Sequence, residues 1–345
     1  MNEDMNTRGH GGFGWKHGLI DLSSNINPLG PPGELMELIK EATEQAQYTH
    51  YPTELGNDLR EGLAKYEGVD SSLTYVFNGA TEALQLLIMY LRPRRIVMPI
   101  PNYSDYGRIA KLMNIELTTL EYWGSGDLVE KIHNKLVRGA MVIISNSNSP
   151  MGYLIQRNEL LEMAEELVRY DGLLLVDESF MDFVKDEQSL IKDIDQHENI
   201  IVVKSYTKFL AIPGLRVGAA YSKIDIEDLV PTWPINSIAE YAVSKYMKHA
   251  AEFRKNTITF INTERNKVLR TLEDLGINYY PSVTHYFVIK HEPWLNDELM
   301  KRGFLIRELS NIPPLTKGYF RFSLRESNIN DAFLNALRET TLIKK

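Results

Sequence analysis

The chain reads IIVVKSYTKFLAIPGLRVG over residues 200–218, and this stretch decides how the remainder is interpreted. It begins with an apolar, β-branched run that is typical of a buried strand. Lys208 follows that strand and precedes a second apolar run, Phe209 to Leu215. An isolated lysine is usually a solvated surface group. Burial at this place would instead lower the pKa of the amine and make it nucleophilic.

Similar apolar runs alternate with helical patterns on the N-terminal side of this stretch. The alternation predicts a mostly parallel sheet covered by helices on both faces. The predicted strands are Leu73–Phe77, Arg95–Met98, Glu116–Leu120, Ala140–Ser145, Leu173–Asp177, Ile200–Lys204 and Arg216–Tyr221. The predicted helices are Glu34–Ala46, Leu55–Tyr66, Thr81–Leu91, Tyr103–Leu112 and Glu159–Tyr170.

The pattern changes after Pro234. A long amphipathic stretch runs from Asn236 to about Leu272, and short strands and a terminal helix follow it. The predicted strands here are Thr284–Lys290, Phe304–Glu308 and Tyr319–Leu324. We therefore expect an N-terminal arm over 1–32, a large domain over 33–235 and a small α+β domain over 236–345. Asn27–Pro32 is predicted to be extended, because proline and the residue before it resist helix.

Composition excludes several classes of protein. The chain has 345 residues, of which 43% are apolar and 24% charged, and it has no cysteine. Disulfides and cysteine-based metal sites are excluded, and we expect no metal. The net charge of −8 argues against nucleic acid, and no apolar stretch is long enough for a membrane span. Residues Met1 to Gly14 lack the apolar segment of a secretory signal, so we expect a cytoplasmic protein.

Polar clusters directly follow several predicted strands, where open α/β sheets bind ligands. Asn78-Gly79-Ala80-Thr81-Glu82 opens a helix, so its backbone N–H groups suit a phosphate, although Asn-Gly also indicates a simple turn. Asp177 ends another strand, where a carboxylate can cap a helix, ligate a metal or pair with a cation.

Ser205-Tyr206-Thr207-Lys208, followed by Gly214-Leu215-Arg216-Val217-Gly218, resembles the cofactor-lysine motif of class I/II aminotransferases, the fold-type-I pyridoxal-phosphate family. The resemblance spans nearly the whole chain and implies pyridoxal 5'-phosphate as cofactor. It implies that Lys208 binds the cofactor covalently and moves protons at the substrate Cα. Asp177 would pair with the pyridinium nitrogen, so that the ring acts as an electron sink. The phosphate would be held by Gly79, Ala80, Thr81, Ser205 and Arg216.

Two tyrosines also match the family pattern. Tyr103 falls where the family stacks an aromatic ring on the cofactor, and Tyr51 resembles the tyrosine that reaches the partner subunit's phosphate. The match implies a homodimer with shared sites. Alternatively, each tyrosine is a core or turn aromatic.

Two subgroups resemble the chain best: histidinol-phosphate aminotransferase and L-threonine-O-3-phosphate decarboxylase. The arm, with His10-Gly11-Gly12 and Asn25-Ile26-Asn27-Pro28, is similar to the decarboxylase, as is Arg321-Phe-Ser-Leu-Arg325. This resemblance implies that a small phosphorylated amino acid is bound by His10, Asn27, Arg321 and Arg325. Two guanidinium groups can grip the carboxylate and the phosphate of such a substrate bidentately. Alternatively, Arg325 makes a surface salt bridge and His10 belongs to a disordered tail.

The expected reaction is decarboxylation of L-threonine O-3-phosphate to (R)-1-amino-2-propanol O-2-phosphate, a step of cobalamin biosynthesis. A class I/II aminotransferase of the histidinol-phosphate type is the alternative, and a pyridoxal-phosphate-binding protein with impaired catalysis is a second.

One departure from the family affects the ring oxygen O3′ of the cofactor. Ser149 stands where the family has an asparagine, and Phe180 where the aminotransferase has a tyrosine, so both usual donors to O3′ are missing. Asn148, a water molecule or Ser149 itself is left as the substitute. Each lost charge-assisted hydrogen bond costs about 1.5–3 kcal/mol.

Overall fold

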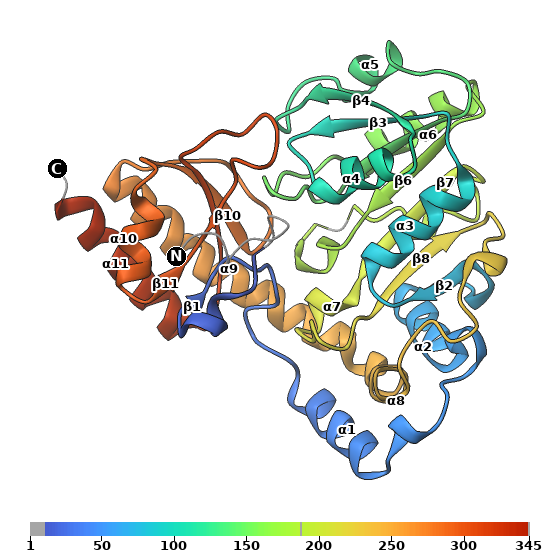
Figure 1. Cartoon of the computed structure of the whole chain (residues 1–345), viewed down its shortest axis with the longest axis horizontal. Coiled ribbons are helices and arrows are strands. Elements are labelled where there is room, and N and C mark those ends of the chain that lie inside the picture. Colours follow the sequence, from blue (N-terminus) through green and yellow to red (C-terminus); the bar gives the residue numbers. More distant parts are fainter. Residues whose placement is uncertain (1–10, 187, 344–345) are drawn as a thin grey trace.

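A seven-stranded sheet forms the centre of the larger of two bodies (Figure 1). The computed structural model describes residues 11–186 and 188–343. The strand order is β2-β8-β7-β6-β5-β3-β4, and only β8 runs antiparallel to its neighbours. The strands are β2 (Thr74–Phe77), β3 (Arg95–Ile100), β4 (Glu116–Glu121), β5 (Ala140–Ser145), β6 (Leu173–Asp177), β7 (Ile200–Ser205) and β8 (Gly218–Ser222). The expected mostly parallel sheet is thus confirmed.

Helices cover both faces of this sheet because side chains alternate along each strand. Val142 and Ile144 of β5 pack in one apolar cluster with α6, whereas Met141 and Ile143 pack in another with α3 and α4. All six residues of β5 are buried, which is why the strand reads as one apolar run. The helices are α1 (Gly33–Glu44), α2 (Asn57–Glu67), α3 (Ala80–Leu91), α4 (Ser104–Leu112), α5 (Leu128–His133), α6 (Arg157–Val168) and α7 (Tyr206–Phe209).

The small body is an antiparallel sheet of order β12-β13-β10-β9 packed with helices. Its elements are α9 (Ala250–Leu275), β9 (Asn278–Tyr279), β10 (Tyr286–Lys290), α10 (Leu295–Lys301), β11 (Phe304–Leu305), β12 (Arg307–Glu308), β13 (Tyr319–Ser323) and α11 (Ser327–Ile343). The strand expected over 304–308 is divided at Ile306, and its first half pairs with the arm instead.

The amphipathic stretch that starts at Asn236 is two helices rather than one. The first, α8 (Ser237–Tyr246), packs against α1 and α2 of the large body. Only the second, α9, continues into the small body (Figure 1). The Asn236 side chain accepts a hydrogen bond from the N–H of Ala239 at 2.8 Å and so caps α8.

The arm, of which residues 11–32 are described, joins the two bodies. Its strand β1 (Ile20–Asp21) pairs in parallel with β11. Further along, the N–H of Asn27 donates to the carbonyl of Lys208 at 3.0 Å. The arm therefore runs from the small body to the loop that carries the lysine.

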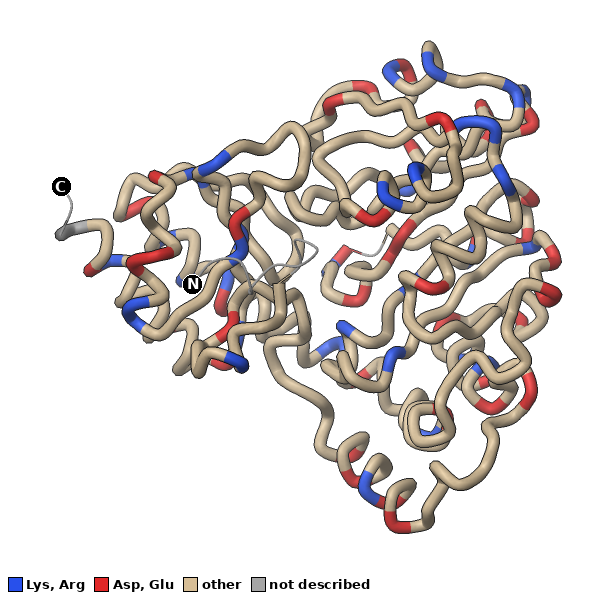
Figure 2. The backbone as a smooth tube through the Cα atoms, viewed as in Figure 1, with Lys and Arg blue, Asp and Glu red and all other residues tan. Residues whose placement is uncertain are grey.

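Figure 2 shows that Lys and Arg positions are interspersed with Asp and Glu positions along the backbone of both bodies. Such mixing gives no broad field of one sign for a polyanion. Among the described residues, no helix has the length and apolar character that a membrane crossing requires.

Candidate active site

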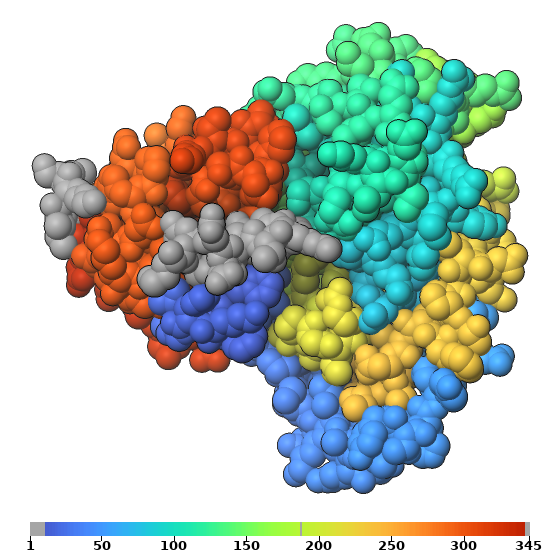
Figure 3. Space-filling view, in the orientation of Figure 1, coloured from blue at the N-terminus to red at the C-terminus, as the bar shows by residue number. Residues whose placement is uncertain are grey.

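A cavity of about 320 Å³ lies where the arm, the small body and the carboxyl ends of β5, β6 and β7 meet. Figure 3 shows the blue arm lying between the orange and red small body and the yellow segment next to it. Ten of the residues expected to act in the site or noted as departures line the cavity: Ala80, Thr81, Tyr103, Ser149, Asp177, Phe180, Ser205, Lys208, Arg216 and Arg321. The volume is in the range of small-molecule sites.

Lys208 is placed by α7, the short helix that follows β7. Its amine lies 4.5 Å from the centre of the Phe180 ring. Burial lowers the pKa of Lys208 to about 8, and the nearby cations Arg216 and Arg321 add to this, while Asp177 opposes it. An amine of this kind is a far better nucleophile near neutral pH than an ordinary lysine.

We predict that cofactor uptake reports this pKa directly. Only the neutral amine attacks an aldehyde, so the rate of covalent attachment should rise about tenfold per pH unit up to about pH 8 and then level off. The rate is measured from the visible band that appears when pyridoxal phosphate is added to cofactor-free protein at a series of pH values. A rate that keeps rising above about pH 9.5, as for an ordinary lysine, would contradict the burial argument.

Asp177 ends β6 and is 6% exposed. Its Oδ2 accepts a hydrogen bond from the hydroxyl of Tyr106 at 2.6 Å, and its Oδ1 accepts one from the N–H of Ser179 at 2.9 Å. Tyr106 is fully buried. Tyr106 was not predicted from the sequence, although it lies only three residues beyond Tyr103 and on the same helix as Asp105. The two donors fix the plane of the carboxylate in the pocket.

We predict that Tyr106→Phe weakens binding of pyridoxal phosphate by about tenfold or more, because a hydrogen bond to a charged group is worth about 1.5–3 kcal/mol. Equilibrium titration of cofactor-free protein measures this dissociation constant. Tyr75→Phe is the matched control, because Tyr75 is also buried but its hydroxyl donates to Ile224 at 3.4 Å, outside the cavity. Equal dissociation constants for the two variants would show that the Tyr106 hydroxyl does not contribute to cofactor binding.

The end of the cavity that suits a phosphate group is lined by Ala80, Thr81, Ser205 and Arg216. Gly79 does not line the cavity but makes room for it. Its φ is +87°, and a Cβ there would lie 2.6 Å from Nη2 of Arg216. A side chain at Gly79 would therefore displace the guanidinium from the N-terminus of α3, where backbone N–H groups favour an anion.

The two tyrosines that the sequence singled out lie in different places. Tyr103 lines the cavity, and its hydroxyl donates to Oδ2 of Asp105 at 2.8 Å. Tyr51 is 76% exposed and stacks on Trp233, with 4.2 Å between the ring centroids. It is not part of the cavity of its own chain.

Asn148 was expected among the cofactor-binding residues, and the structure places it elsewhere. It is fully buried, its Nδ2 donates to the carbonyl of Pro101 at 3.1 Å, and its Oδ1 accepts from Met151 at 2.9 Å. Tyr286 closes the same loop by donating to the carbonyl of Asn148 at 2.6 Å. Asn148 thus holds the loop together, and its neighbour Ser149 lines the cavity instead.

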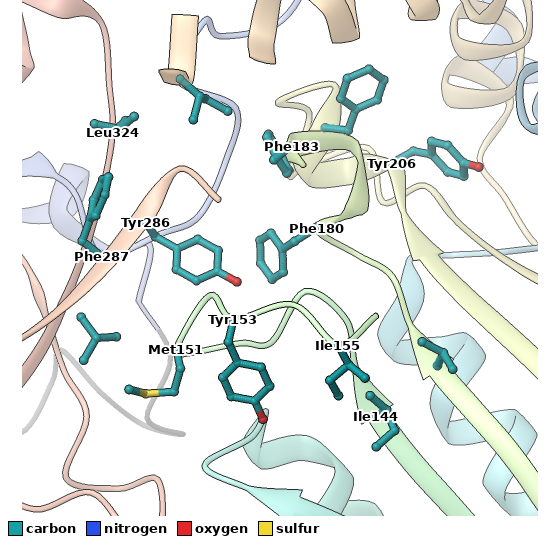
Figure 4. Packing of buried hydrophobic residues seen from close by; sticks show 14 of the residues in the cluster. Ile144, Met151, Tyr153, Ile155, Phe180, Phe183, Tyr206, Tyr286, Phe287 and Leu324 are labelled. Atoms are coloured by element: carbon teal, nitrogen blue, oxygen red, sulfur yellow. The ribbon is translucent and has the colours of Figure 1, made fainter. Parts of the chain in front are cut away.

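Aromatic packing makes this side of the cavity rigid. Figure 4 shows the rings of Tyr286, from β10, and Phe180, from the loop after β6, pointing toward one another. Their centroids are 5.0 Å apart with an interplanar angle of 71°. Because the two residues belong to different bodies, this contact joins the small body to the loop that follows Asp177.

The pair of arginines in the cavity differs from the expected pair. Arg321 of β13 lines the cavity and lies with its guanidinium 5.6 Å from the Tyr286 ring. Its register partner on β12 is Arg307, which also lines the cavity, is 7% exposed and donates to Asn311 at 2.7 Å. Arg307 was not predicted from the sequence, because a lone arginine in a short strand gives no signal by itself.

Arg325, which was expected to be the second anion-binding group, does not line this cavity. Its Nη2 donates to the carbonyl and the hydroxyl of Ser24, both at 2.9 Å, and to the carbonyl of Asp21, while its Nη1 donates to Leu324. Backbone carbonyls of the arm occupy the fork that the substrate was expected to occupy. Arg325 thus fastens the arm to the small body.

Asn27, which was expected to bind the substrate, is held by contacts within the chain. It is 1% exposed, its Nδ2 donates to Phe209 and to Thr257, both at 2.9 Å, and its Oδ1 accepts from Leu29 at 3.0 Å. Its neighbours Asn25 and Ile26 line the cavity, and Asn27 does not. His10 lies outside the described residues.

These residues fit a phosphorylated aldehyde cofactor. One cavity brings together a nucleophilic amine, a carboxylate held by two donors, and a phosphate-type cradle that a Cβ at Gly79 would fill. The fold and the site therefore define an enzyme of the pyridoxal-phosphate type.

The comparison with protein families identifies which one. The family model for aminotransferase class I and II matches residues 17–337, and the chain belongs to that family. Pyridoxal phosphate is its cofactor, as the lysine motif implied.

Individual relatives divide between two reactions. The chain is 30% identical to a "Putative threonine-phosphate decarboxylase" of Caldanaerobacter subterraneus subsp. tengcongensis, over 97% of this chain and 95% of the relative. It is also 30% identical to a histidinol-phosphate aminotransferase of the same organism, over 92% of each chain. The crystal structure of the histidinol-phosphate aminotransferase from Clostridium acetobutylicum matches with a TM-score of 0.85 and 25% identity, over 94% of this chain and 100% of that one.

Proposed function

We propose that the protein decarboxylates a small phosphorylated amino acid, with L-threonine O-3-phosphate as the substrate and (R)-1-amino-2-propanol O-2-phosphate as the product. The observation that carries the proposal is the register pair Arg307 and Arg321, which places two guanidinium groups in the cavity with Lys208. The similarity to the decarboxylase relative supports it.

The arginine pair suits a substrate with two anionic groups. L-threonine phosphate carries a carboxylate and a phosphate on a short skeleton, whereas histidinol phosphate carries only the phosphate. Guanidinium groups bind both kinds of anion through paired N–H donors. Directly opposite residues on antiparallel strands have Cβ atoms about 4.5–5.5 Å apart, so the two guanidinium groups are close enough to grip two anionic groups of one small molecule.

Bound pyridoxal phosphate supplies an electron sink for the bond that breaks at the substrate Cα. The chain's own residues then perform the remaining tasks. Asp177, oriented by Tyr106 and Ser179, pairs with the ring nitrogen, and Arg216, Ser205 and the start of α3 hold the phosphate. Arg307 and Arg321 turn the substrate so that its carboxylate is the group that departs. The amine of Lys208 then returns a proton to Cα.

We also propose a homodimer in which Tyr51 reaches the phosphate of the other subunit. The exposure of Tyr51 supports this, because its ring lies stacked on Trp233 at the surface rather than in its own cavity. Exposed aromatic residues of this kind are enriched at interfaces.

A substrate panel on the holoenzyme tests the reaction. With threonine phosphate, we expect release of CO₂ in equal amount to aminopropanol phosphate, and little product from serine phosphate or from threonine. Carbon dioxide and amine products are measured together. No CO₂ from any phosphorylated amino acid would reject the proposal.

The second candidate is an aminotransferase of the histidinol-phosphate type. It is favoured by the relative that is 30% identical and carries that name, since identity alone does not separate the two reactions. Formation of glutamate from histidinol phosphate and 2-oxoglutarate, without CO₂, would select it. A holoenzyme that binds substrate but turns over neither compound would indicate a cofactor-binding protein with impaired catalysis.

A further inference from the structure

Two serine hydroxyls in the cavity have no task in the arrangement described so far. Ser179 is 3% exposed, lines the cavity, and its Oγ makes no hydrogen bond within the described part of the chain. Ser149 is 8% exposed and lines the same cavity. A buried hydroxyl without a partner is costly, so its presence beside a ligand site points to a bond made with the ligand.

The sheet brings the two serines together. Ser145 and Asp177 are register partners at the ends of the adjacent parallel strands β5 and β6. Ser149 follows the first strand end and Ser179 follows the second, so both belong to neighbouring loops. The N–H of Ser149 donates to Ser145 Oγ at 3.2 Å, and the N–H of Ser179 donates to Asp177 Oδ1 at 2.9 Å. Their backbones are thereby fixed next to the carboxylate.

The polar groups of the cofactor can then be matched with those of the cavity. Its phosphate is matched by Arg216, Ser205 and the N–H groups at the start of α3, and its ring nitrogen is matched by the carboxylate of Asp177. The third group is the ring oxygen, which is bonded to the carbon next to the one that bears the aldehyde. It must therefore lie close to Lys208, where the Phe180 ring offers no hydroxyl.

Several other polar side chains near this point already have partners. Asn148 donates to Pro101, and Ser145 Oγ accepts from Ser149 and donates to Ser147 at 3.3 Å. In the arm, Ser23 donates to Asp21, and Asn25 accepts from Ser323. From the positions of Ser149 and Ser179 in the cavity and the unpartnered Oγ of Ser179, we infer that the two hydroxyls donate hydrogen bonds to the ring oxygen of the bound cofactor.

This inference rests on the proposed placement of the cofactor and is independent of whether the reaction is decarboxylation. A donor to the ring oxygen reduces the negative charge on that oxygen. The oxygen then retains the neighbouring proton, shared with the Lys208 nitrogen, less strongly. Removing the donors should therefore raise the pH at which the visible band of the bound cofactor titrates.

The test is a pH titration of that band in Ser149→Ala, Ser179→Ala and the double variant. We expect the midpoint to rise in each single variant and by about one pH unit, a tenfold change in the equilibrium, in the double variant. Ser147→Ala is the matched control, because Ser147 is a buried serine of the same loop that does not line the cavity. Its midpoint should equal that of the parent.

Midpoints that are unchanged in all three variants would overturn the inference, and so would an equal rise in Ser147→Ala. A rise in only one of the two single variants would show that the other serine does not donate to the ring oxygen. Failure of the proposed function is recognised separately, because the parent would then show the visible band and its titration but no CO₂ release.

Discussion

Lys208→Ala is expected to abolish turnover, lowering the rate by at least about 10³-fold, because it removes both the covalent anchor and the group that moves protons at Cα. The cavity itself should persist, since the Lys208 carbonyl, which accepts from Asn27, is retained. Cofactor should still bind without a covalent bond, with a spectrum like that of the free aldehyde. Turnover, measured as CO₂ release, and absorption spectra check both parts.

A second buried lysine provides the control for this prediction. Lys204 lies four residues earlier on β7, and its amine donates to Glu67 at 2.7 Å and lies 3.0 Å from Asp182. Burial acts to lower the pKa of Lys204, but these two carboxylates outweigh it and raise the pKa, so the amine stays charged and unreactive. Borohydride reduction of the holoenzyme should therefore fix the cofactor on Lys208 alone. A reduced adduct on the peptide that carries Lys204 instead would overturn the assignment.

Replacing Arg321 or Arg307 by Gln is expected to lower kcat/KM for threonine phosphate by about 10–100-fold each, since each charge-assisted interaction is worth about 1.5–3 kcal/mol. Burial lowers the pKa of Arg321 to about 10, which still leaves it charged near neutral pH. Steady-state kinetics over a range of substrate concentrations gives this value for each variant.

A substrate lacking the phosphate identifies which arginine holds it. In the parent enzyme, threonine should react far more slowly than threonine phosphate. In the variant that has lost the phosphate-binding arginine, the difference in rate between threonine phosphate and threonine should shrink. The arginine and the substrate phosphate are the two partners of one interaction, so removing the second partner costs little once the first is gone. Arg325→Gln should leave the difference as in the parent and lower thermal stability, since Arg325 binds carbonyls of the arm. A difference that shrinks only in Arg325→Gln would restore Arg325 as the anion-binding residue.

The arm contacts one of the two arginines proposed to bind the substrate. Arg321 itself donates to the carbonyl of Ser23 at 3.1 Å, so the substrate cavity and the anchoring of the arm share one side chain. Ser323 also donates to Asn25 at 2.6 Å. The arm therefore acts as a wall of the cavity that is fastened by the same strand, β13, that supplies Arg321.

The sequence by itself determined the sheet, the cofactor and the residues that lie at strand ends. The strand ends near Lys208 and Asp177 follow from local patterns, and a strand end in a parallel sheet has a fixed position. The roles of Lys208, Asp177 and Arg216 were inferred from the resemblance of the lysine motif to class I/II aminotransferases. The strand limits inferred for β5 and β6 agree with the structure for the same reason: both strands are buried on two faces and read as continuous apolar runs.

Only the tertiary structure decided which polar side chains reach the cavity. Arg307 and Arg325 are both arginines that could bind an anion beside Arg321. The antiparallel register places Arg307 opposite Arg321, whereas the guanidinium of Arg325 donates to carbonyls of the arm. Likewise Asn148 turns into its own loop and leaves the cavity to Ser149, and Tyr106 reaches Asp177 across 71 residues of sequence. Which side chains reach the cavity depends on strand register and on contacts between residues far apart in the chain. A sequence pattern reflects only the preferences of neighbouring residues.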